Sequence, residues 1–299
     1  MGKIAATVGT FDGVHMGHQT LLSELVKNGK EKGLPTAVIT FDVPPISVIY
    51  PTRPYQQLCS LEEKKQRLLM SGVDQVIIIE FNQTLSHLSA EDFMRDILRD
   101  KYHVEYLLVG YDHRFGYKRS EGFEDYREIG RNLGIEVCKS QEEFIAIDKT
   151  VSSSRIRALL GTGLISEANQ LLGYNYTITG KVVGGFRIGR TLGYPTANII
   201  PDTPHKLIPA HGVYAVFIHI GSKRFRGMLY IGNRPTFENG HNITIEVNIF
   251  DFKDDIYDRT ITLELVALTR NDKKFDSMEE LRDQIRKDGE QIQELLADY

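Results

Sequence analysis

Short, mainly apolar runs alternate with longer amphipathic segments through the first half of the chain. Such runs are typical of strands buried on both faces, and their alternation with helices is typical of a parallel sheet. The pattern predicts strands at residues 4–8, 37–41, 76–79, 106–109 and 135–138. Because parallel sheets bind ligands at the carboxyl ends of their strands, we expect the chemistry to lie in the loops that follow these strands.

The segments between these strands carry helix start and stop signals. Ser60 and Ser89 each precede an acidic residue by three positions, which is the pattern of a capping box. Gly33, Gly72 and Gly134 follow the last helical positions, where a left-handed backbone conformation ends many helices. The first half is therefore predicted to form a Rossmann-like α/β domain with a parallel sheet.

From about Tyr176 the apolar residues recur at every second position, without helices between the runs. This period is typical of half-buried strands and favours a small antiparallel β-barrel or sandwich. The strands are predicted at residues 176–183, 213–220, 225–231, 243–249 and 260–265. A closing helix after Ser277 would lay an apolar stripe against the barrel. The stripe consists of Leu281, Ile285, Ile292, Leu295 and Leu296.

Length and composition agree with two folded domains, which we place at residues 1–173 and 174–299 of the 299-residue chain. The formal net charge of −4 argues against a general nucleic-acid binder. Cys59 and Cys138 are the only cysteines, and their separation fits neither a disulfide framework nor a cysteine metal site. A reducing cytoplasm is expected, and we expect no export signal, lipid anchor or membrane helix.

The first candidate site is the loop after the first predicted strand. It comprises Gly9, Thr10, Phe11, Asp12, His15, Gly17 and His18. The histidines are three residues apart at a helix start, so they share one face of the first turn. Free N–H groups and the helix dipole favour an anion there, and both imidazoles can donate hydrogen bonds to a phosphate that approaches over Gly17. Taken alone, such a pair is more often a solvated or capping pair.

A second arrangement suited to an anion lies at residues 151–157. Three serines precede two arginines at the start of another predicted helix, which supplies hydroxyl and guanidinium donors together. A serine cluster alone is usually an ordinary helix cap. Because the histidine loop is also suited to an anion, we treat this segment as a second candidate phosphate site.

Together, the H-x-G-H run and residues 151–157 resemble the nucleotidyltransferase module of bacterial FAD synthetases. The resemblance implies that His15 and His18 contact the ATP phosphates and that Asp12 assists at the metal–nucleotide site. The triphosphate would be held by Ser153, Ser154 and Arg157. The loop at 110–116 is similar to a family segment lining the same cleft, so Asp112 joins the ATP-binding candidates. Residues 42–45 read Asp-Val-Pro-Pro, where the family more usually has a P-H-P-like stretch.

The second half contains another candidate nucleotide site. A glycine-rich stretch at 184–191 nearly matches a P-loop, but a proline follows where the helix of a P-loop should begin. Thr196 and Asn198 offer oxygen ligands of the kind that Mg²⁺ prefers. Glu246 falls on the polar face of a period-two strand, where a carboxylate beside a substrate hydroxyl can remove its proton. Isolated glycine loops and strand-face glutamates are usually only turns and solvated residues.

Four ordered segments of this half resemble riboflavin kinase: residues 180–198, 212–214, 231–236 and 246–252. The resemblance implies that Thr196 and Asn198 bind Mg-ATP, and that Glu246 is the base acting on the riboflavin 5′-hydroxyl. It further implies a nucleotide-binding loop of Gly185, Phe186, Arg187, Gly189 and Arg190.

With both modules matched, the resemblance spans nearly the whole chain and indicates the bifunctional riboflavin kinase and FMN adenylyltransferase family. It implies a cytoplasmic enzyme that makes FMN in its C-terminal domain and FAD in its N-terminal domain. ATP would be the co-substrate, Mg²⁺ the cofactor, and riboflavin, FMN and FAD the substrates or products. No nucleic-acid, membrane or obligate protein partner is implied.

Three alternatives stay open at this point. The chain could be a monofunctional riboflavin kinase whose first domain is inactive or uses another nucleotide, in line with the departure at residues 42–45. It could be a non-catalytic flavin-binding sensor that consumes no ATP. The H-x-G-H helix also occurs in aminoacyl-tRNA synthetases, which would make the second domain an RNA-binding appendage. Those enzymes carry a lysine-rich second signature, whereas this chain has serines and arginines at 151–157 and a net charge of −4.

Overall fold

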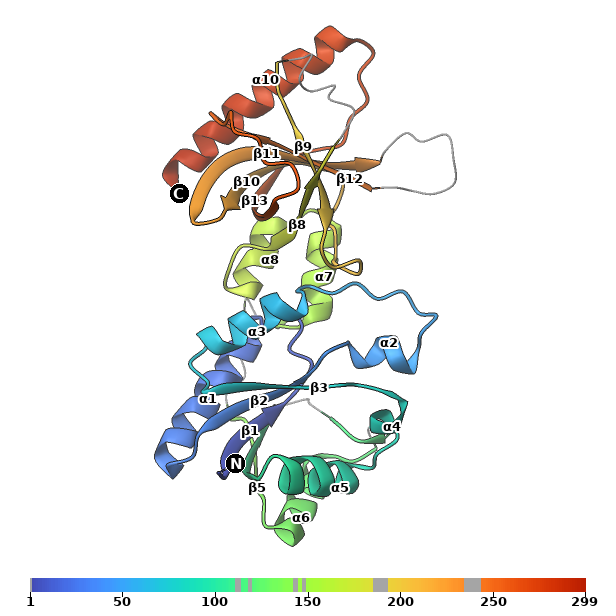
Figure 1. Ribbon diagram of the computed structural model, residues 1–299, viewed down its shortest axis with the longest axis vertical. Coiled ribbons are helices and arrows are strands. Elements are labelled where there is room, and N and C mark those ends of the chain that lie inside the picture. Colours follow the sequence, from blue (N-terminus) through green and yellow to red (C-terminus); the bar gives the residue numbers. More distant parts are fainter. Residues whose placement is uncertain are drawn as a thin grey trace. The chain divides into compact units, whose positions relative to one another are not determined.

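The computed structural model divides into two compact units, Met1–Ser153 and Ser154–Tyr299. It describes residues 2–110, 114–117, 120–141, 145–146, 149–184, 193–233 and 243–299. Each unit has its own secondary structure and its own hydrophobic core, and Figure 1 traces the chain through both. Among the described residues, no helix is both long enough and apolar enough to cross a membrane.

The first unit is built on a parallel sheet of five strands in the order β3-β2-β1-β4-β5. The strands are β1 (Ile4–Val8), β2 (Thr36–Phe41), β3 (Gln75–Ile79), β4 (Val104–Val109) and β5 (Glu136–Lys139). All five lie where the apolar runs predicted them, and the predicted parallel pairing is confirmed. The chain order reverses between β1 and β4, which is where an open α/β sheet opens a crevice for a ligand.

Helices cover both faces of this sheet (Figure 1). One face packs against α1 (Met16–Lys32) and α3 (Leu61–Met70) through a core that includes Leu22 and Leu68. The other face packs against α6 (Phe123–Leu133) and the π-helix η1 (Phe93–Lys101), which continues α5 (Ala90–Asp92). Two short helices, α2 (Pro45–Ile49) and α4 (Gln83–Ser86), and a small hairpin of β6 (Ile145–Ala146) and β7 (Lys149–Thr150) complete the unit.

The predicted helix boundaries are held by the expected caps. Ser60 and Glu63 form a reciprocal capping box at the start of α3, and the Ser89 hydroxyl accepts a hydrogen bond from the Asp92 N–H. Gly33 and Gly134 end α1 and α6 in the left-handed conformation, with φ of 67° and 74°. These contacts satisfy helix-end groups that would otherwise lack partners.

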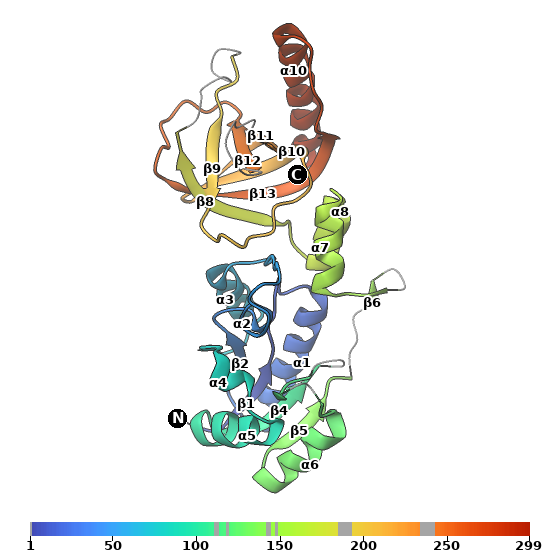
Figure 2. The same cartoon turned by 90° about the vertical axis from the view of Figure 1, so that its right-hand side faces the viewer.

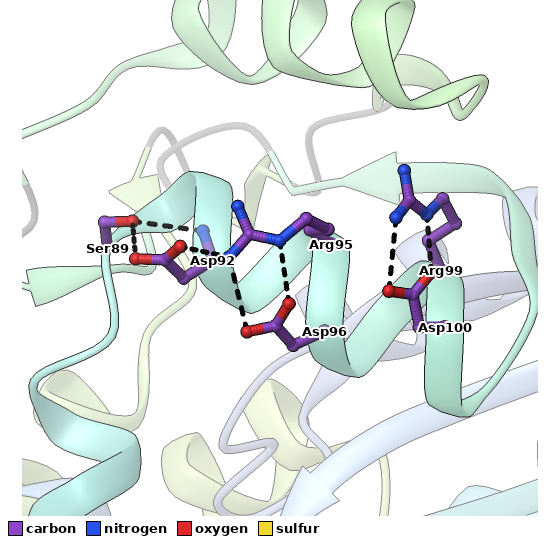
Figure 3. Close-up of polar contacts among 6 residues, drawn as sticks. All are labelled: Ser89, Asp92, Arg95, Asp96, Arg99 and Asp100. Atoms are coloured by element: carbon purple, nitrogen blue, oxygen red, sulfur yellow. Dashed lines mark hydrogen bonds and ion pairs between the residues drawn. The ribbon is translucent and has the colours of Figure 1, made fainter.

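The solvent side of α5 and η1 carries a row of ion pairs (Figure 3). Arg95 contacts Asp92 and Asp96, and Arg99 contacts Asp100 with an Nε to Oδ1 distance of 2.6 Å. Because these pairs are exposed to solvent, they contribute little to the stability of the fold. The burial of Phe93, Met94 and Leu98 on the opposite side fixes the helix to the sheet.

The second unit is a closed antiparallel barrel in the strand order β10-β11-β12-β9-β8-β13. The strands are β8 (Thr177–Val183), β9 (Ala197–Pro201), β10 (Gly212–Ile220), β11 (Lys223–Asn233), β12 (Ile243–Ile249) and β13 (Thr260–Asn271). The predicted antiparallel barrel is confirmed. The sequence pattern did not indicate β9, which carries Asn198 and joins β12 to β8 to close the barrel.

The predicted closing helix is α10 (Met278–Leu295), capped by the Ser277 hydroxyl and followed by the short helix η3 (Leu296–Asp298). The helix α10 lies on the outside of the barrel (Figure 2), and its Ile292 packs with Leu296 against a cluster that includes Val213, Ala215 and Phe217. Inside the barrel, Tyr214, Leu229, Val247, Leu263 and Leu265 are fully buried. Four residues of the predicted stripe, Ile285, Ile292, Leu295 and Leu296, therefore pack in the cluster between α10 and the barrel.

Two helices precede the barrel, α7 (Ser153–Gly161) and α8 (Ile165–Leu172). Asn169 on α8 donates a hydrogen bond to the Leu265 carbonyl, and the Ala210 N–H donates to the Leu160 carbonyl. These contacts group both helices with the barrel. The boundary between functional domains near Gly173 stays a prediction.

Replacing Gly227 by alanine tests the closeness of β11 and β12. An added Cβ would collide with the Asn248 carbonyl oxygen and with the Ile218 side chain. We expect the substitution to lower the free energy of unfolding of the second unit by about 1–3 kcal/mol, the usual cost of overpacking. Gly161→Ala is the matched control because a Cβ there meets no atom within 4 Å. Equal urea unfolding midpoints for the two variants would contradict the packing described.

Candidate active sites

The loop between β1 and α1 has an unusual backbone. Phe11, Gly13 and Val14 all have positive φ, at 49°, 83° and 38°. Positive φ suits glycine but is strained for a β-branched residue such as valine. Such strain persists only where the surrounding structure holds it, and it gathers at functional sites. This loop leads directly into the two histidines.

His15 is the N-cap residue of α1, with its Nδ1 accepting a hydrogen bond from the His18 N–H at 3.4 Å. The two imidazoles stack with their centroids 3.6 Å apart and their planes 15° apart, and the Phe11 ring meets His18 edge-on. His15 is only 5% exposed. The predicted sharing of one helix face is therefore present, and the stacked pair lies at the positive end of the α1 dipole.

Glycines keep this loop compact. A Cβ added to Gly9 would lie 2.9 Å from the Phe11 ring, and one added to Gly17 would lie 3.4 Å from the His15 ring. Thr10 is exposed at the end of β1. A larger residue at position 9 would displace the aromatic ring that contacts His18.

The carboxylate of Asp12 is 9% exposed and is bound to the segment that precedes α3. Its Oδ1 accepts from the N–H groups of Leu58 at 2.9 Å and Cys59 at 3.3 Å, and its Oδ2 accepts from the Tyr55 hydroxyl at 2.9 Å. Both oxygens thus tie the histidine loop to residues 55–59. The role of Asp12 at a metal–nucleotide site stays a prediction.

The second predicted anion segment begins beside this loop. The Ser153 hydroxyl donates a hydrogen bond to the Asp12 carbonyl at 2.8 Å. Ser154 and Arg157 lie on the first turns of α7, with Ser154 exposed and Arg157 half-buried. Asp112, predicted to join this site, lies outside the described residues.

The segment at residues 42–45 takes a defined local structure. Asp42 Oδ1 accepts hydrogen bonds from the N–H groups of Val43 and Phe81, and Pro44 is the N-cap residue of α2. The departure from the family pattern therefore begins a short helix at the carboxyl end of β2.

In the second unit, Glu246 lies on the polar outer face of β12, as the period of two predicted. Its Oε2 accepts a hydrogen bond from the Thr196 hydroxyl at 3.1 Å, and its Oε1 accepts one from the Thr244 hydroxyl at 3.3 Å. Glu246 is half-buried. Two hydroxyl donors therefore hold the carboxylate at the barrel surface while part of it remains open to solvent.

Thr196 and Asn198, the residues predicted to bind Mg-ATP, lie beside Glu246. Asn198 on β9 pairs in register with Glu246, and Thr196 precedes that strand. The Asn248 side chain donates to the Pro195 carbonyl at 2.7 Å and fixes the approach to β9. The predicted loop residues Gly185, Phe186, Arg187, Gly189 and Arg190 lie outside the described residues.

Among the described residues, no group of three or more His, Cys, Asp or Glu side chains is arranged to hold a metal ion. Thr196 and Asn198 nevertheless fit Mg²⁺, because hydroxyl and amide oxygens are hard ligands and ATP phosphates complete the shell of such ions. The Thr196 hydroxyl donates a hydrogen bond to Glu246, so the lone pairs of its oxygen can face a cation.

Sequence reasoning missed Tyr230 on β11, which pairs in register with Glu246. Its hydroxyl donates to Asp272 at 3.1 Å, and its ring lies where a Cβ on Gly232 would be. Burial and the negative charges of Asp272 and Glu246 raise the pKa of Tyr230 to about 12. Tyr230 is therefore a neutral donor at neutral pH. Only the strand register brings it beside the carboxylate.

Sequence reasoning also missed Lys64, which lies on α3 and is 8% exposed. Burial lowers the pKa of its ammonium group, while Cys59, Asp12 and Asp42 act in the opposite direction. A signal was available: Lys64 is four residues before the buried Leu68, so it lies on the buried face of the helix.

Two family models match the chain in sequence order. The model described as FAD synthetase matches residues 2–155, and the one described as riboflavin kinase matches residues 172–296. A solved structure from Streptococcus pneumoniae, described as a macrolide-efflux protein, is 32% identical with a TM-score of 0.88 and covers 96% of this chain and 93% of its own.

Curated relatives extend over nearly the whole chain. A protein of Escherichia coli strain K12 is 35% identical over 94% of this chain and 89% of its own length. One of Listeria monocytogenes is 36% identical over 99% and 93%, respectively. Both are named bifunctional riboflavin kinase/FMN adenylyltransferase. Together with the two family models, these relatives show that the chain belongs to the bifunctional riboflavin kinase/FMN adenylyltransferase family.

Proposed function

We propose that this chain phosphorylates riboflavin to FMN with ATP and then transfers the adenylyl group of a second ATP to FMN, giving FAD and pyrophosphate. We assign the transfer to residues 1–173 and the phosphorylation to residues 174–299. The observation that carries the proposal is the position of the Glu246 carboxylate. It accepts a hydrogen bond from the Thr196 hydroxyl, and Glu246 pairs in register with Asn198. The chain's two free thiols, Cys59 and Cys138, fit the reducing cytoplasm in which we place it.

In the kinase reaction, Glu246 takes the proton of the riboflavin 5′-hydroxyl as that oxygen attacks the γ-phosphorus of ATP and ADP leaves. The Thr196 and Thr244 hydroxyls fix the direction of the carboxylate, so less reorganisation is needed when the substrate arrives. Thr196 and Asn198 would hold Mg²⁺ together with the phosphates. The ion, when bound, offsets the negative charge of the triphosphate.

In the adenylyl transfer, an FMN phosphate oxygen attacks the α-phosphorus of ATP and pyrophosphate leaves. The protein needs no nucleophile of its own, so its part is to position the reactants and stabilise developing charge. His15 and His18 donate hydrogen bonds to the ATP phosphates, next to the N–H groups at the start of α1. Ser153, Ser154 and Arg157 complete the binding of the triphosphate, and we place Asp112 with them.

Incubation of the chain with riboflavin, ATP and Mg²⁺, followed by separation of the flavins, tests the whole proposal. FMN and FAD are expected with release of ADP and pyrophosphate. Riboflavin recovered unchanged would contradict it and favour a flavin-binding sensor. FMN supplied directly separates the bifunctional enzyme from a monofunctional kinase, because only the former converts it to FAD.

Glu246→Gln keeps the shape of the side chain but removes the base. We expect FMN formation to fall about 10²–10⁴-fold, the usual contribution of general base catalysis, while FMN is still converted to FAD. Glu290→Gln is the control because it removes an exposed carboxylate from the same unit. If Glu246→Gln forms FMN at the rate of this control, Glu246 is not the base.

His15→Asn removes the imidazole and retains a favoured N-cap residue for α1. We expect FMN-to-FAD conversion to fall about 10²-fold or more, as when a charge-stabilising donor is lost, with riboflavin phosphorylation unchanged. His87→Asn, at the exposed C-cap of α4 in the same unit, controls for the loss of a histidine. An undiminished rate of FAD formation, or an equal loss of both activities, would remove His15 from the proposed site.

A further inference from the structure

Lys64 brings a cation to the carboxyl edge of the parallel sheet. Its Nζ donates to the Phe41 carbonyl at the end of β2 at 2.8 Å, and lies 3.4 Å from the Thr10 carbonyl just after β1. The Thr40 hydroxyl donates to the same Thr10 oxygen at 3.3 Å. The ammonium group therefore joins the two loops that leave neighbouring strands.

Holding a charge at this place costs folding free energy. Lysine is almost never fully buried unless it is paired, and Lys64 is 8% exposed. It occupies the first turn of α3, where the helix dipole disfavours a cation. Because burial lowers its pKa on folding, the protonated lysine destabilises the folded state at neutral pH. The hydrogen bonds to the carbonyls of Phe41 and Thr10 offset part of this cost.

The contacts around Lys64 converge on the strained loop. Phe11 and Val14 have positive φ and must be held by their surroundings. The Gly13 N–H donates to the Cys59 thiol at 3.1 Å, and Asp12 is bound by Tyr55 and the backbone of the same segment. The segment that leads into α3, together with Lys64 on α3, thus holds the loop at Thr10, Asp12 and Gly13.

These parts are packed closely. The cavity that remains between Thr10, Asp12, Tyr55 and Lys64 has a volume of about 10 Å³. That volume is close to the minimum that holds one water molecule, so these side chains leave little internal space between them. Removal of the ammonium group would open this space beside the loop.

We propose that Lys64 is a positioning residue for adenylyl transfer: its ammonium group holds the end of β1 and the strained loop so that His15 and His18 are aligned to bind ATP phosphates. The inference rests on the proposed function of the first unit. In this proposal Lys64 contacts neither substrate. It acts through the backbone carbonyls of Thr10 and Phe41.

Lys64→Met tests the proposal, because methionine keeps most of the volume and removes the charge and the donors. Lys65→Met is the matched control, since Lys65 is the exposed neighbour on the same helix. For both variants we would measure the KM for ATP and for FMN in FAD formation, and the rate of riboflavin phosphorylation by the same chain. Wild-type protein that makes no FAD from FMN would contradict the proposed function rather than this inference.

We expect Lys64→Met to raise the KM for ATP in FAD formation about tenfold, since small misalignments of binding groups weaken such contacts strongly. The KM for FMN, the kinase rate and all properties of Lys65→Met should match those of the wild type. A partly unfolded variant would lose active enzyme without changing a KM, so this measurement separates alignment from stability. An unchanged KM for ATP, or a rise confined to the KM for FMN, would overturn the proposal.

Lys64→Gln is the second variant, because its amide can still donate to the Phe41 carbonyl. We expect a rise in the KM for ATP smaller than that of Lys64→Met. If circular dichroism shows that the first unit fails to fold in both variants, Lys64 serves the fold rather than the alignment of the histidines, and the proposal is wrong.

Discussion

A buried carboxylate needs hydrogen-bond donors, and the donors that Asp12 receives fix the loop between β1 and α1 in the first unit. It lies in the middle of a loop whose backbone is strained on either side, and its two oxygens take donors from residues 55–59. The free energy of these bonds holds the loop in a conformation that its own residues disfavour. The helix that follows can then begin at an imidazole that is well placed for phosphate.

The second unit meets a related constraint in another way. Glu246 is attached to a rigid barrel strand, and hydroxyl groups from Thr196 and Thr244 satisfy it. These neutral hydroxyl donors fix the direction of the carboxylate on the strand. One unit therefore holds its candidate site by bracing a strained loop, and the other carries its proposed base on a regular strand.

Much of this architecture could be predicted from local patterns. Apolar runs and their periods gave ten of the strands near their observed bounds, because strand and helix periodicity depends on neighbours in sequence. Strand β9 was missed because Pro195, Thr196 and Asn198 suggest a loop, and pairing with β12 and β8 makes the strand.

The candidate sites divide in the same way. The histidine spacing and the polar face of Glu246 follow from local geometry. The ties of Asp12 to Tyr55, the contact of Lys64 with the end of β2 and the pairing of Tyr230 with Glu246 join distant parts of the chain. No period or spacing within one segment encodes such contacts, so a single sequence could at most flag Lys64 as a charge on an apolar face.

The Tyr230 and Gly232 pair limits how this strand can change over evolution. The tyrosine ring occupies the space into which any side chain at position 232 would extend. A side chain at position 232 therefore requires this ring to move aside and its hydroxyl to leave Asp272. The effect of a substitution at one position thus depends on the residue at the other, so the two positions are epistatic.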